Sequence, residues 1–296
     1  MAHERVYYNP GSGNAESLID LRLALPDEST HWIKLSHDTD LHQSVSEAIA
    51  TGCRTVVAAG GDGTINAIVN ALMGFDFDQR PALAIVPLGS ANDFAGTLGI
   101  PDEVALAAEL IFRTTAVPTD VVRASNGSFV RYFANVAAGG NCVRVSESLT
   151  GELKSRWGAL SYIRGALDVL PDMITYRVSM RCDGEEFADL NSWAVLIANG
   201  RTNAGRIEVA PKASPVDGLM DVILIRDGTI ADMIQIVANN LLGDFLASEQ
   251  VVFRQAKSLV LESTPPMRFT LDGEVIDEFP NQFDVMRGAI KMHRGV

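Results

Sequence analysis

Cysteine is scarce in this chain. The 296 residues include three cysteines, Cys53, Cys142 and Cys182, which lie far apart and form no CxxC pair. An odd and scattered set of this kind predicts neither a disulfide framework nor a zinc site. We therefore expect buried free thiols and a reducing, cytoplasmic compartment.

Long apolar runs and an excess of basic residues are also missing. No run approaches the roughly 18 residues that a membrane-spanning helix needs, and the N-terminal MAHERVYYNP has no apolar core of a signal peptide. Acidic residues outnumber basic ones by 37 to 24, which gives a net charge of −13. This balance argues against nucleic acid as a partner, because basic side chains drive that contact. With 47% hydrophobic residues, the chain is expected to fold around a sizeable core and to be soluble, at most peripheral to a membrane.

The first part of the chain has the pattern of an α/β domain. From Val6 to about Thr119, short apolar runs alternate with amphipathic stretches, which predicts an open parallel sheet covered by helices. The expected strands are 6–8, 32–35, 55–59 and 82–86, and the expected helices are 41–50, 65–73 and 103–112. The pattern changes near Pro118, so we place the first domain at residues 1–119.

The second part, residues 120–296, has the pattern of an antiparallel β-sandwich. The dipeptides Asn126-Gly127 and Asp183-Gly184 each separate two strand-like runs, which is a strong hairpin signal. The expected strands are 121–124, 129–136, 176–181, 187–198, 221–225, 251–254, 259–262, 268–271 and 283–286, and the expected helices are 159–170 and 230–242.

Three glycine-rich loops follow three of the expected parallel strands. They are Asn9-Pro10-Gly11-Ser12-Gly13, Gly60-Gly61-Asp62-Gly63-Thr64, and 87–94, which includes Ser90 and Asp93. Glycine lets the backbone approach an anion closely, so that N–H groups donate to phosphate oxygens. Loops after parallel strands share one edge of the sheet, which predicts a phosphate site there. The chain has neither the GxxxxGK[ST] nor the GxGxxG pattern, and each loop alone also fits a plain turn.

Asp62 is the exception in its loop, because a carboxylate repels phosphate unless a cation intervenes. We interpret Asp62 as a direct or water-mediated Mg²⁺ partner, with Asp93 of the adjacent loop positioning the same ion through water. The alternative is a tight turn in which Asp62 or Thr64 caps the following helix.

These motifs together carry a resemblance to a known family. The set NPGSG, GGDGTINAIVNAL and PLGSANDFAGTLGIP closely resembles the diacylglycerol kinase catalytic domain family, which includes bacterial soluble lipid kinases, sphingosine kinase and ceramide kinase. The resemblance continues through VAPKASPVDGLMD and LDGE, and so covers nearly the whole chain. It implies a nucleotide-binding α/β domain like that of diacylglycerol and NAD kinases, a β-sandwich domain, and an active site in the cleft between them. It further implies ATP, Mg²⁺ and a lipid substrate, diacylglycerol or a related glycerolipid.

The resemblance also assigns roles to residues. The implied ATP-binding set is Asn9, Pro10, Gly11, Ser12, Gly13, Ser36, Gly60, Gly61, Asp62, Gly63, Thr64, Ile65, Asn66, Ser90 and Asp93. Ser36 and Ser90 stand where relatives have threonine, and Asn14 stands where relatives often have a basic residue. Ser214, Asp217 and Leu219, the last through its carbonyl, match a structural Mg²⁺ site. Glu274 matches the family's proton acceptor.

The LDGE motif also suggests chemistry by itself. Asp272 and Glu274 flank a glycine after an expected strand, and phosphoryl transfer needs a carboxylate or similar group to take the acceptor proton. We therefore treat Asp62, Asp272 and Glu274 as candidate catalytic residues. The alternative for Asp272-Gly273 is a hairpin turn with exposed acids, and Asp217-Gly218 is open to the same alternative. Lys154 either brings positive charge to the site or is a solvated surface lysine.

Three functions remain open at this stage. The first is an ATP- and Mg²⁺-dependent lipid kinase. The second is an NAD kinase, which also uses GGDGT but is not expected to carry the other motifs. The third is a non-catalytic nucleotide- or lipid-binding regulator. The net charge of −13 is unfavourable for meeting an anionic membrane unless basic residues such as Lys154, Arg156 and Arg164 cluster on one face. A membrane surface and a second copy of the chain are the candidate partners besides the lipid.

Overall fold

The computed structural model describes residues 4–11, 15–25, 30–148, 172–241, 243, 246 and 248–295. The chain divides into two compact units, Met1–Val121 with Arg287–Val296, and Val122–Met286. This division differs from the expected domains 1–119 and 120–296 mainly at the C-terminus, where the last residues return to the first unit.

The first unit is built on a parallel sheet. Its strands are β2 (Thr30–Lys34), β1 (Glu4–Tyr8), β3 (Thr55–Gly60) and β4 (Ala82–Pro87), in that spatial order. The end of β17 (Gln282–Met292) adds a further parallel contact, because Met292 pairs with Leu83 of β4. All six residues of β3 are buried, as expected for a parallel strand with helices on both faces.

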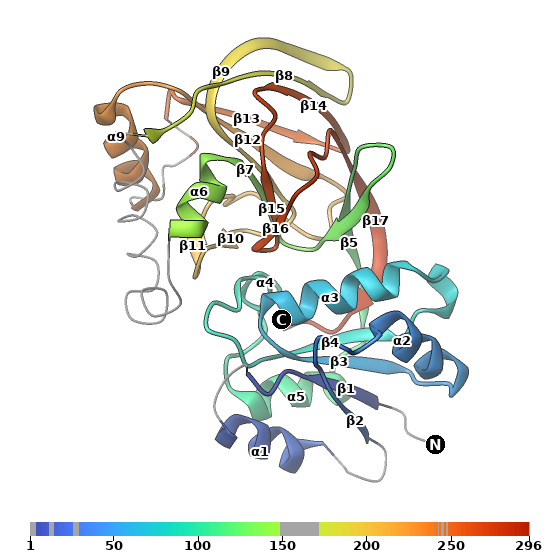
Figure 1. Ribbon diagram of the computed structural model, residues 1–296. Coiled ribbons are helices and arrows are strands. Elements are labelled where there is room, and N and C mark those ends of the chain that lie inside the picture. The colour runs from blue at the N-terminus through green and yellow to red at the C-terminus, as the bar shows by residue number, and fades with distance from the viewer. Residues whose placement is uncertain are drawn as a thin grey trace. The chain divides into compact units, whose positions relative to one another are not determined.

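Helices cover both faces of this sheet (Figure 1). Helix α2 (Leu41–Ala50) contacts α3 (Asp62–Met73), and α1 (Ala15–Ala24) contacts α5 (Val104–Arg113). The short helices η2 (Phe77–Gln79) and α4 (Asp93–Thr97) complete the unit. The predicted α/β class is confirmed; helices were expected to follow the loops at 9–13 and 87–94, but no residue ranges were predicted for α1 or α4. Helix α1 leaves Ile19 and Leu23 exposed, so its sequence lacks a clear apolar face.

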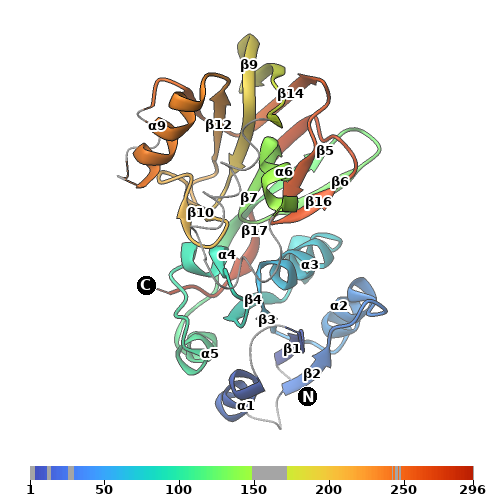
Figure 2. The same ribbon diagram turned by 60° about the vertical axis from the view of Figure 1, so that its left-hand side comes forward.

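The second unit is made mostly of antiparallel strands. They are the end of β5 (Val117–Ser125), which begins in the first unit, then β6 (Val130–Phe133), β7 (Val136–Gly140), β8 (Tyr176–Cys182), β9 (Glu185–Ala198), β10 (Thr202–Asn203), β11 (Ile207–Glu208), β12 (Met220–Arg226), β13 (Val251–Ala256), β14 (Ser258–Thr264), β15 (Phe269–Leu271), β16 (Glu274–Ile276) and the start of β17. One path of paired strands runs β16-β15-β7-β9-β8-β14-β17, and β12 pairs with both β9 and β13. Helices α6 (Asn141–Ser148) and α9 (Ile230–Leu241) belong to the same unit (Figure 2).

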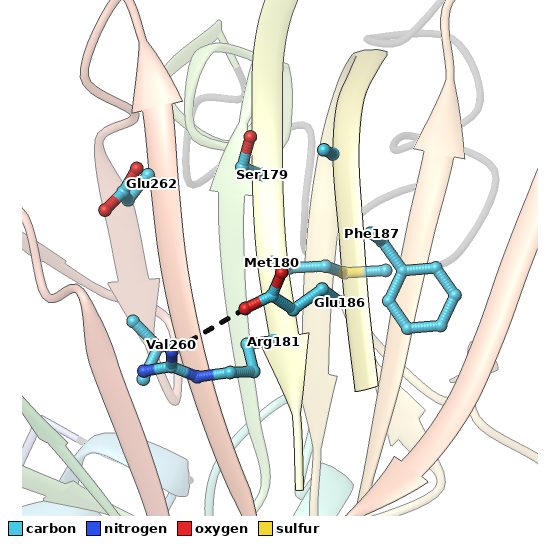
Figure 3. A pocket seen from close by; sticks show the side chains of 8 residues that line it. Ser179, Met180, Arg181, Glu186, Phe187, Val260 and Glu262 are labelled. Carbon is cyan, nitrogen blue, oxygen red and sulfur yellow. Dashed lines mark ion pairs between the residues drawn. The ribbon is translucent and has the colours of Figure 1, made fainter. Parts of the chain in front are cut away.

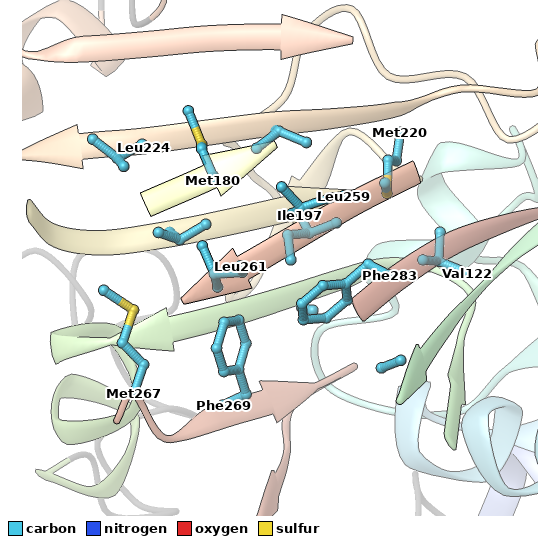
Figure 4. Packing of buried hydrophobic residues seen from close by; sticks show 14 of the residues in the cluster. Val122, Met180, Ile197, Met220, Leu224, Leu259, Leu261, Met267, Phe269 and Phe283 are labelled. Atoms are coloured by element: carbon cyan, nitrogen blue, oxygen red, sulfur yellow. The ribbon is translucent and has the colours of Figure 1, made fainter. Parts of the chain in front are cut away.

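The predicted hairpins are present. Strands β5 and β6 pair across Asn126-Gly127, and β8 and β9 pair across Asp183-Gly184. Asp183 and Gly184 have φ values of 47° and 96°, the left-handed pair that a type I′ turn requires. The predicted β-sandwich class is confirmed, and its core lies between the strands (Figure 4). There the rings of Phe269 and Phe283 are 5.5 Å apart between centroids.

Some element predictions were wrong. The single strand expected at 129–136 is split into β6 and β7, because the backbone N–H groups of Ala134, Asn135 and Val136 donate to the Asp272 carboxylate. Helix α6 and strand β16 were not predicted. The helix expected at 159–170 lies outside the described residues. Within the described residues, no helix is both long enough and apolar enough to cross a membrane.

Gly139 provides a test of the packing in this core. A Cβ atom at Gly139 would lie 2.5 Å from the Phe269 ring. Gly139→Ala is therefore expected to lower the free energy of unfolding by about 1–3 kcal/mol through overpacking. Denaturant unfolding of Gly139→Ala, Phe269→Leu and the double variant measures the energetic coupling between residues 139 and 269. Additive effects in the double variant would contradict this contact as the cause.

Candidate functional site

The predicted phosphate-binding residues follow the ends of four neighbouring parallel strands. Asn9 follows β1, Ser36 follows β2, Gly61 follows β3 and Ser90 follows β4, so that they share one edge of the sheet. Asn9 Oδ1 accepts the Gly11 N–H at 2.9 Å and so holds the first loop in a turn. Ser12, Gly13 and Asn14 lie outside the described residues.

Ser36 and Ser90 are both exposed on these loops. The backbone N–H and the hydroxyl of Ser36 contact Thr39 Oγ1 at 2.9 and 3.1 Å. The Ser36 hydroxyl is thus tied to its own loop, whereas Ser90 is placed with its side chain at the solvent. Both positions are compatible with the hydrogen-bonding roles that the resemblance implies.

The loops after β3 and β4 touch through their backbones. A Cβ atom at Gly89 would lie 2.5 Å from Gly61 Cα, and one at Gly61 would lie 3.2 Å from Gly89 Cα. Asn92 fixes the second loop, because its Oδ1 accepts the Gly89 N–H and its Nδ2 donates to the Gly89 carbonyl. Glycine is required here by the close approach of two main chains.

Asp62 joins the same two loops. Its carboxylate oxygens accept the N–H groups of Asp93 and Phe94, at 3.2 and 3.1 Å, in the first turn of α4. Asp62 therefore caps the neighbouring helix rather than its own. A carboxylate has about four acceptor positions, so these two bonds leave room for a water or a cation.

The N-terminus of α3 has no side-chain cap. The N-cap is Gly61, which makes no side-chain cap bond. The N–H groups of Thr64 and Ile65 donate to the Gly61 carbonyl. The N–H groups of Asp62 and Gly63 precede these bonds, so the helix itself offers them no acceptor. Such a helix start favours an anion.

The other residues of the predicted ATP set are mostly inside the fold. Thr64 packs against Gly60, where a side chain would collide with it. Ile65 and Asn66 are buried, and Asn66 Oδ1 accepts a bond from Asn70 at 3.1 Å. Asp93 is 4% exposed. The side chains of Ile65 and Asn66 therefore position α3 through packing, and the predicted role of these residues in ATP binding stays a prediction.

In the second unit, Asp272 is held by backbone groups. Asp272 and Gly273 have φ values of 49° and 86°, and they form a type I′ turn between β15 and β16. The Asp272 carboxylate accepts the N–H groups of three consecutive residues, Ala134, Asn135 and Val136, at 2.9, 2.9 and 3.0 Å. Three bonds take up most of the roughly four acceptor positions of a carboxylate, so the geometry favours a positioning role over the predicted catalytic one.

Glu274 differs from Asp272 in its surroundings. It begins β16 on the far side of the turn and is exposed. The anchored turn fixes the backbone of Glu274 while leaving its carboxylate at the surface. This combination suits a group that must reach a substrate hydroxyl.

Asn135 is a residue of this region that the sequence reasoning missed. It is 3% exposed, its Nδ2 donates to the Thr202 carbonyl at 2.9 Å, and its carbonyl accepts the N–H groups of Asn199 and Gly200. It links the Asp272 turn with the loop that follows β9. The signal in the sequence is an asparagine inside an otherwise apolar run, FANVAA.

The predicted structural metal residues form one turn. Asp217 donates its N–H to the Ser214 carbonyl at 3.4 Å, and Asp217 Oδ1 accepts the Leu219 N–H at 2.9 Å. Asp221 follows on β12 and is 1% exposed. Burial raises the pKa of Asp221 to about 6; its hydrogen bond from Gln255 opposes the shift, the Asp217 charge adds to it, and Lys212 opposes it.

The donor atoms of this turn fit a hard divalent cation. Carboxylate and carbonyl oxygens are the ligands that Mg²⁺ prefers, and among the described residues nothing hydrogen-bonds Asp221 Oδ2. In the described ranges, no three or more His, Cys, Asp or Glu side chains are grouped so that they could hold a metal ion by themselves. A cation at the 214–219 turn would therefore depend on backbone oxygens as well as on carboxylates.

A hollow of about 200 Å³ lies elsewhere, on β8, β9 and β14. It contains an Arg181–Glu186 ion pair at 3.9 Å, with Phe187 and Met180 beside it (Figure 3). None of the predicted site residues lines it. Lys154, Arg156 and Arg164, which were considered as a source of positive charge, lie outside the described residues.

Comparison with known proteins gives matches over both units. Residues 3–124 match the family model for the diacylglycerol kinase catalytic domain. Residues 134–294 match the model for the YegS C-terminal NAD kinase beta sandwich-like domain. A diacylglycerol kinase of Bacillus subtilis is 30% identical over 96% of this chain and 93% of its own length. One from Staphylococcus carnosus is 27% identical over 98% of this chain and 94% of its own length.

Solved structures show the same fold. A diacylglycerol kinase from Bacillus anthracis superposes with a TM-score of 0.78 at 25% identity, covering 99% of this chain and 96% of that one. An NAD kinase from Archaeoglobus fulgidus, solved in complex with ATP, has a TM-score of 0.54 at 14% identity, covering 98% and 92% of the two chains. The latter likeness concerns the fold alone.

The contact between Gly61 and Gly89 gives a test of the sheet edge. Gly89→Ala is expected to force the two loops apart and to lower the free energy of unfolding by about 1–3 kcal/mol. Gly96→Ala in α4 is the matched control, because a Cβ there meets no atom within 4 Å beyond its own stretch of helix. Thermal unfolding compares the two variants, and an equal Tm for both would contradict the close approach.

Proposed function

The chain belongs to the diacylglycerol kinase family, and on that premise we propose that it transfers the γ-phosphate of ATP, in the presence of Mg²⁺, to the hydroxyl of diacylglycerol or a related glycerolipid. It is a kinase by its family. The observation that most supports the proposal is the glycine-lined sheet edge, where the loops after β3 and β4 meet at the uncapped start of α3.

In this proposal the first unit binds the phosphates of ATP. The N–H groups at the start of α3 donate to phosphate oxygens, because Gly61 supplies no side chain to compete for them. Asn9, Gly11 and Ser36 lie in the neighbouring loops at the same edge of the sheet and complete the proposed ATP site there. The backbone thus supplies much of the anion contact, which suits a chain with a net charge of −13.

The residues present also fit the ions that the family implies. Asp62 and Asp93 would hold the catalytic Mg²⁺ through water, and the ion would neutralise charge on the phosphates. Asp62 can do so while keeping its bonds to the first turn of α4. Ser214, Asp217 and Leu219 would hold the structural Mg²⁺ at their turn.

Glu274 is proposed as the general base. Its carboxylate takes the proton of the lipid hydroxyl as that oxygen forms a bond to the γ-phosphorus, and the bond from the γ-phosphorus to the bridging oxygen of ADP breaks. Asp272 keeps the turn in place through its three backbone bonds. Because the acceptor is a lipid, the protein would meet a membrane surface peripherally.

The roles of Asp272 and Glu274 can be separated by two variants. Glu274→Gln is expected to lower kcat by about 10²–10⁴-fold with an unchanged Tm, because Glu274 is exposed. Asp272→Asn is expected to lower the free energy of unfolding by about 1–3 kcal/mol, because it weakens bonds to backbone N–H groups. Steady-state kinetics and denaturant unfolding of both variants make the comparison. Full activity in Glu274→Gln would remove it as the base.

The substrate is tested with γ-labelled ATP and Mg²⁺ against diacylglycerol, monoacylglycerol, sphingosine, ceramide, phosphatidylglycerol and NAD. We expect label on diacylglycerol or a related glycerolipid, lost in Glu274→Gln. Label on NAD alone would overturn the lipid assignment. ATP binding without transfer to any member of the panel would contradict the proposed reaction and favour the regulator.

A further inference from the structure

Asp221 is an acidic residue placed among apolar side chains of the second unit. On β12, Val222 belongs to one hydrophobic cluster, whereas Ile223 belongs to a second cluster together with Ala210 and Ala213. Because successive residues of a strand face opposite sides of the sheet, Asp221 shares the face of Ile223. This is the face covered by the segment that leads into the 214–219 turn.

The hydrogen bonding of Asp221 is incomplete. Its Oδ1 accepts a bond from Gln255 Nε2 on β13 at 2.9 Å. Its Oδ2 is buried and has no hydrogen-bond partner among the described residues. A buried carboxylate oxygen left in this way is unfavourable and requires a proton, a water or a cation.

The charges nearby favour a cation. The Asp217 carboxylate is close enough for its negative charge to act on Asp221, so the two acids repel each other. The ammonium group of Lys212 also acts on Asp221, but it lies over the Phe253 ring, 5.1 Å from the ring centroid. A divalent cation would offset the negative charge of both carboxylates at once, whereas a water brings no charge and a single proton neutralises only one of them.

We propose that Asp221 is a ligand, directly or through one water, of the divalent cation held at the 214–219 turn. The ion then fastens this turn to β12 and, through Gln255, to β13. The inference rests on the cation site of the proposed function and extends it by a residue to which the motif assigns no role.

The test measures ion binding without ATP. Isothermal titration with Mn²⁺ is expected to show one bound ion in the unaltered protein. Thermal unfolding is expected to show a gain of about 5 °C at a Mg²⁺ concentration roughly 100 times Kd, relative to EDTA. Asp221→Asn is expected to weaken Mn²⁺ binding about tenfold or more and to lose the Mg²⁺-dependent gain. Its Tm in EDTA should equal or exceed that of the unaltered protein, because a buried charge is removed.

Asp120→Asn is the matched control. Asp120 is also 1% exposed on a strand, but its Oδ1 accepts the Gly288 N–H at 2.6 Å. This variant should have a lower Tm with and without Mg²⁺ and should keep the full Mg²⁺-dependent gain. If Asp221→Asn does not fold, Gln255→Ala keeps the carboxylate and is expected to weaken Mn²⁺ binding by disturbing its orientation.

Several outcomes would overturn the inference. The first is that the unaltered protein binds no Mn²⁺ without ATP. The second is that Asp221→Asn keeps full Mn²⁺ affinity. The third is that Asp217→Asn loses Mn²⁺ binding whereas Asp221→Asn does not. The kinase assay is independent of these measurements. Phosphate transfer without any ion effect at Asp221 would overturn this inference alone, and ion binding at Asp221 without phosphate transfer would overturn the proposed function alone.

Discussion

The close approach of the loops after β3 and β4 is the constraint on which the first unit depends. These strands are neighbours in register, with Gly60 opposite Pro87, so their following loops leave the sheet side by side. Gly61 and Gly89 then meet main chain to main chain, so that a Cβ atom at Gly89 would collide with Gly61 and one at Gly61 would be tightly placed. Because Gly61 is also the N-cap of α3, the same glycine that permits the contact leaves the helix start without a capping side chain. The packing of the two loops and the proposed anion recognition therefore depend on the same small residue, Gly61.

Both units use an aspartate to satisfy the backbone of a distant loop. Asp62 accepts two N–H groups at the start of α4, and Asp272 accepts three at the junction of β6 and β7. Loops at strand ends leave such groups outside the sheet ladder, and a carboxylate can bind several of them strongly. The consequence differs in the two places. Asp62 lies at the sheet edge and keeps free acceptor positions, whereas Asp272 is held in its turn and, in the proposed function, Glu274 is the reactive group.

Local signals in the sequence predicted much of this fold. Two kinds of signal depend on neighbouring residues alone: the apolar runs at 55–59 and 82–86, and the turn pairs Asn126-Gly127 and Asp183-Gly184. These strands and hairpins appear in the structure where they were predicted. The break between β6 and β7 was missed because its cause is Asp272, which is remote in sequence. The return of β17 to the first sheet was missed because Met292 pairs with Leu83, which is also remote in sequence. Motifs indicated the loops of the site, but not that Asp62 would cap a neighbouring helix.

The fold resembles that of an NAD kinase at 14% identity, which raises the question of which residues select the phosphate acceptor. A fold shared at that level does not determine the acceptor. The proposed binding of phosphates at the sheet edge would use backbone N–H groups and glycine contacts, which make no distinction between a lipid and a nucleotide acceptor. In the proposed function the acceptor hydroxyl would have to reach Glu274, whose position follows from the Asp272 turn, from Asn135 and from the loop after β9. Within the proposed function, specificity for a lipid is therefore to be sought in side chains of the second unit, and the phosphate-binding edge accounts only for the transfer of phosphate.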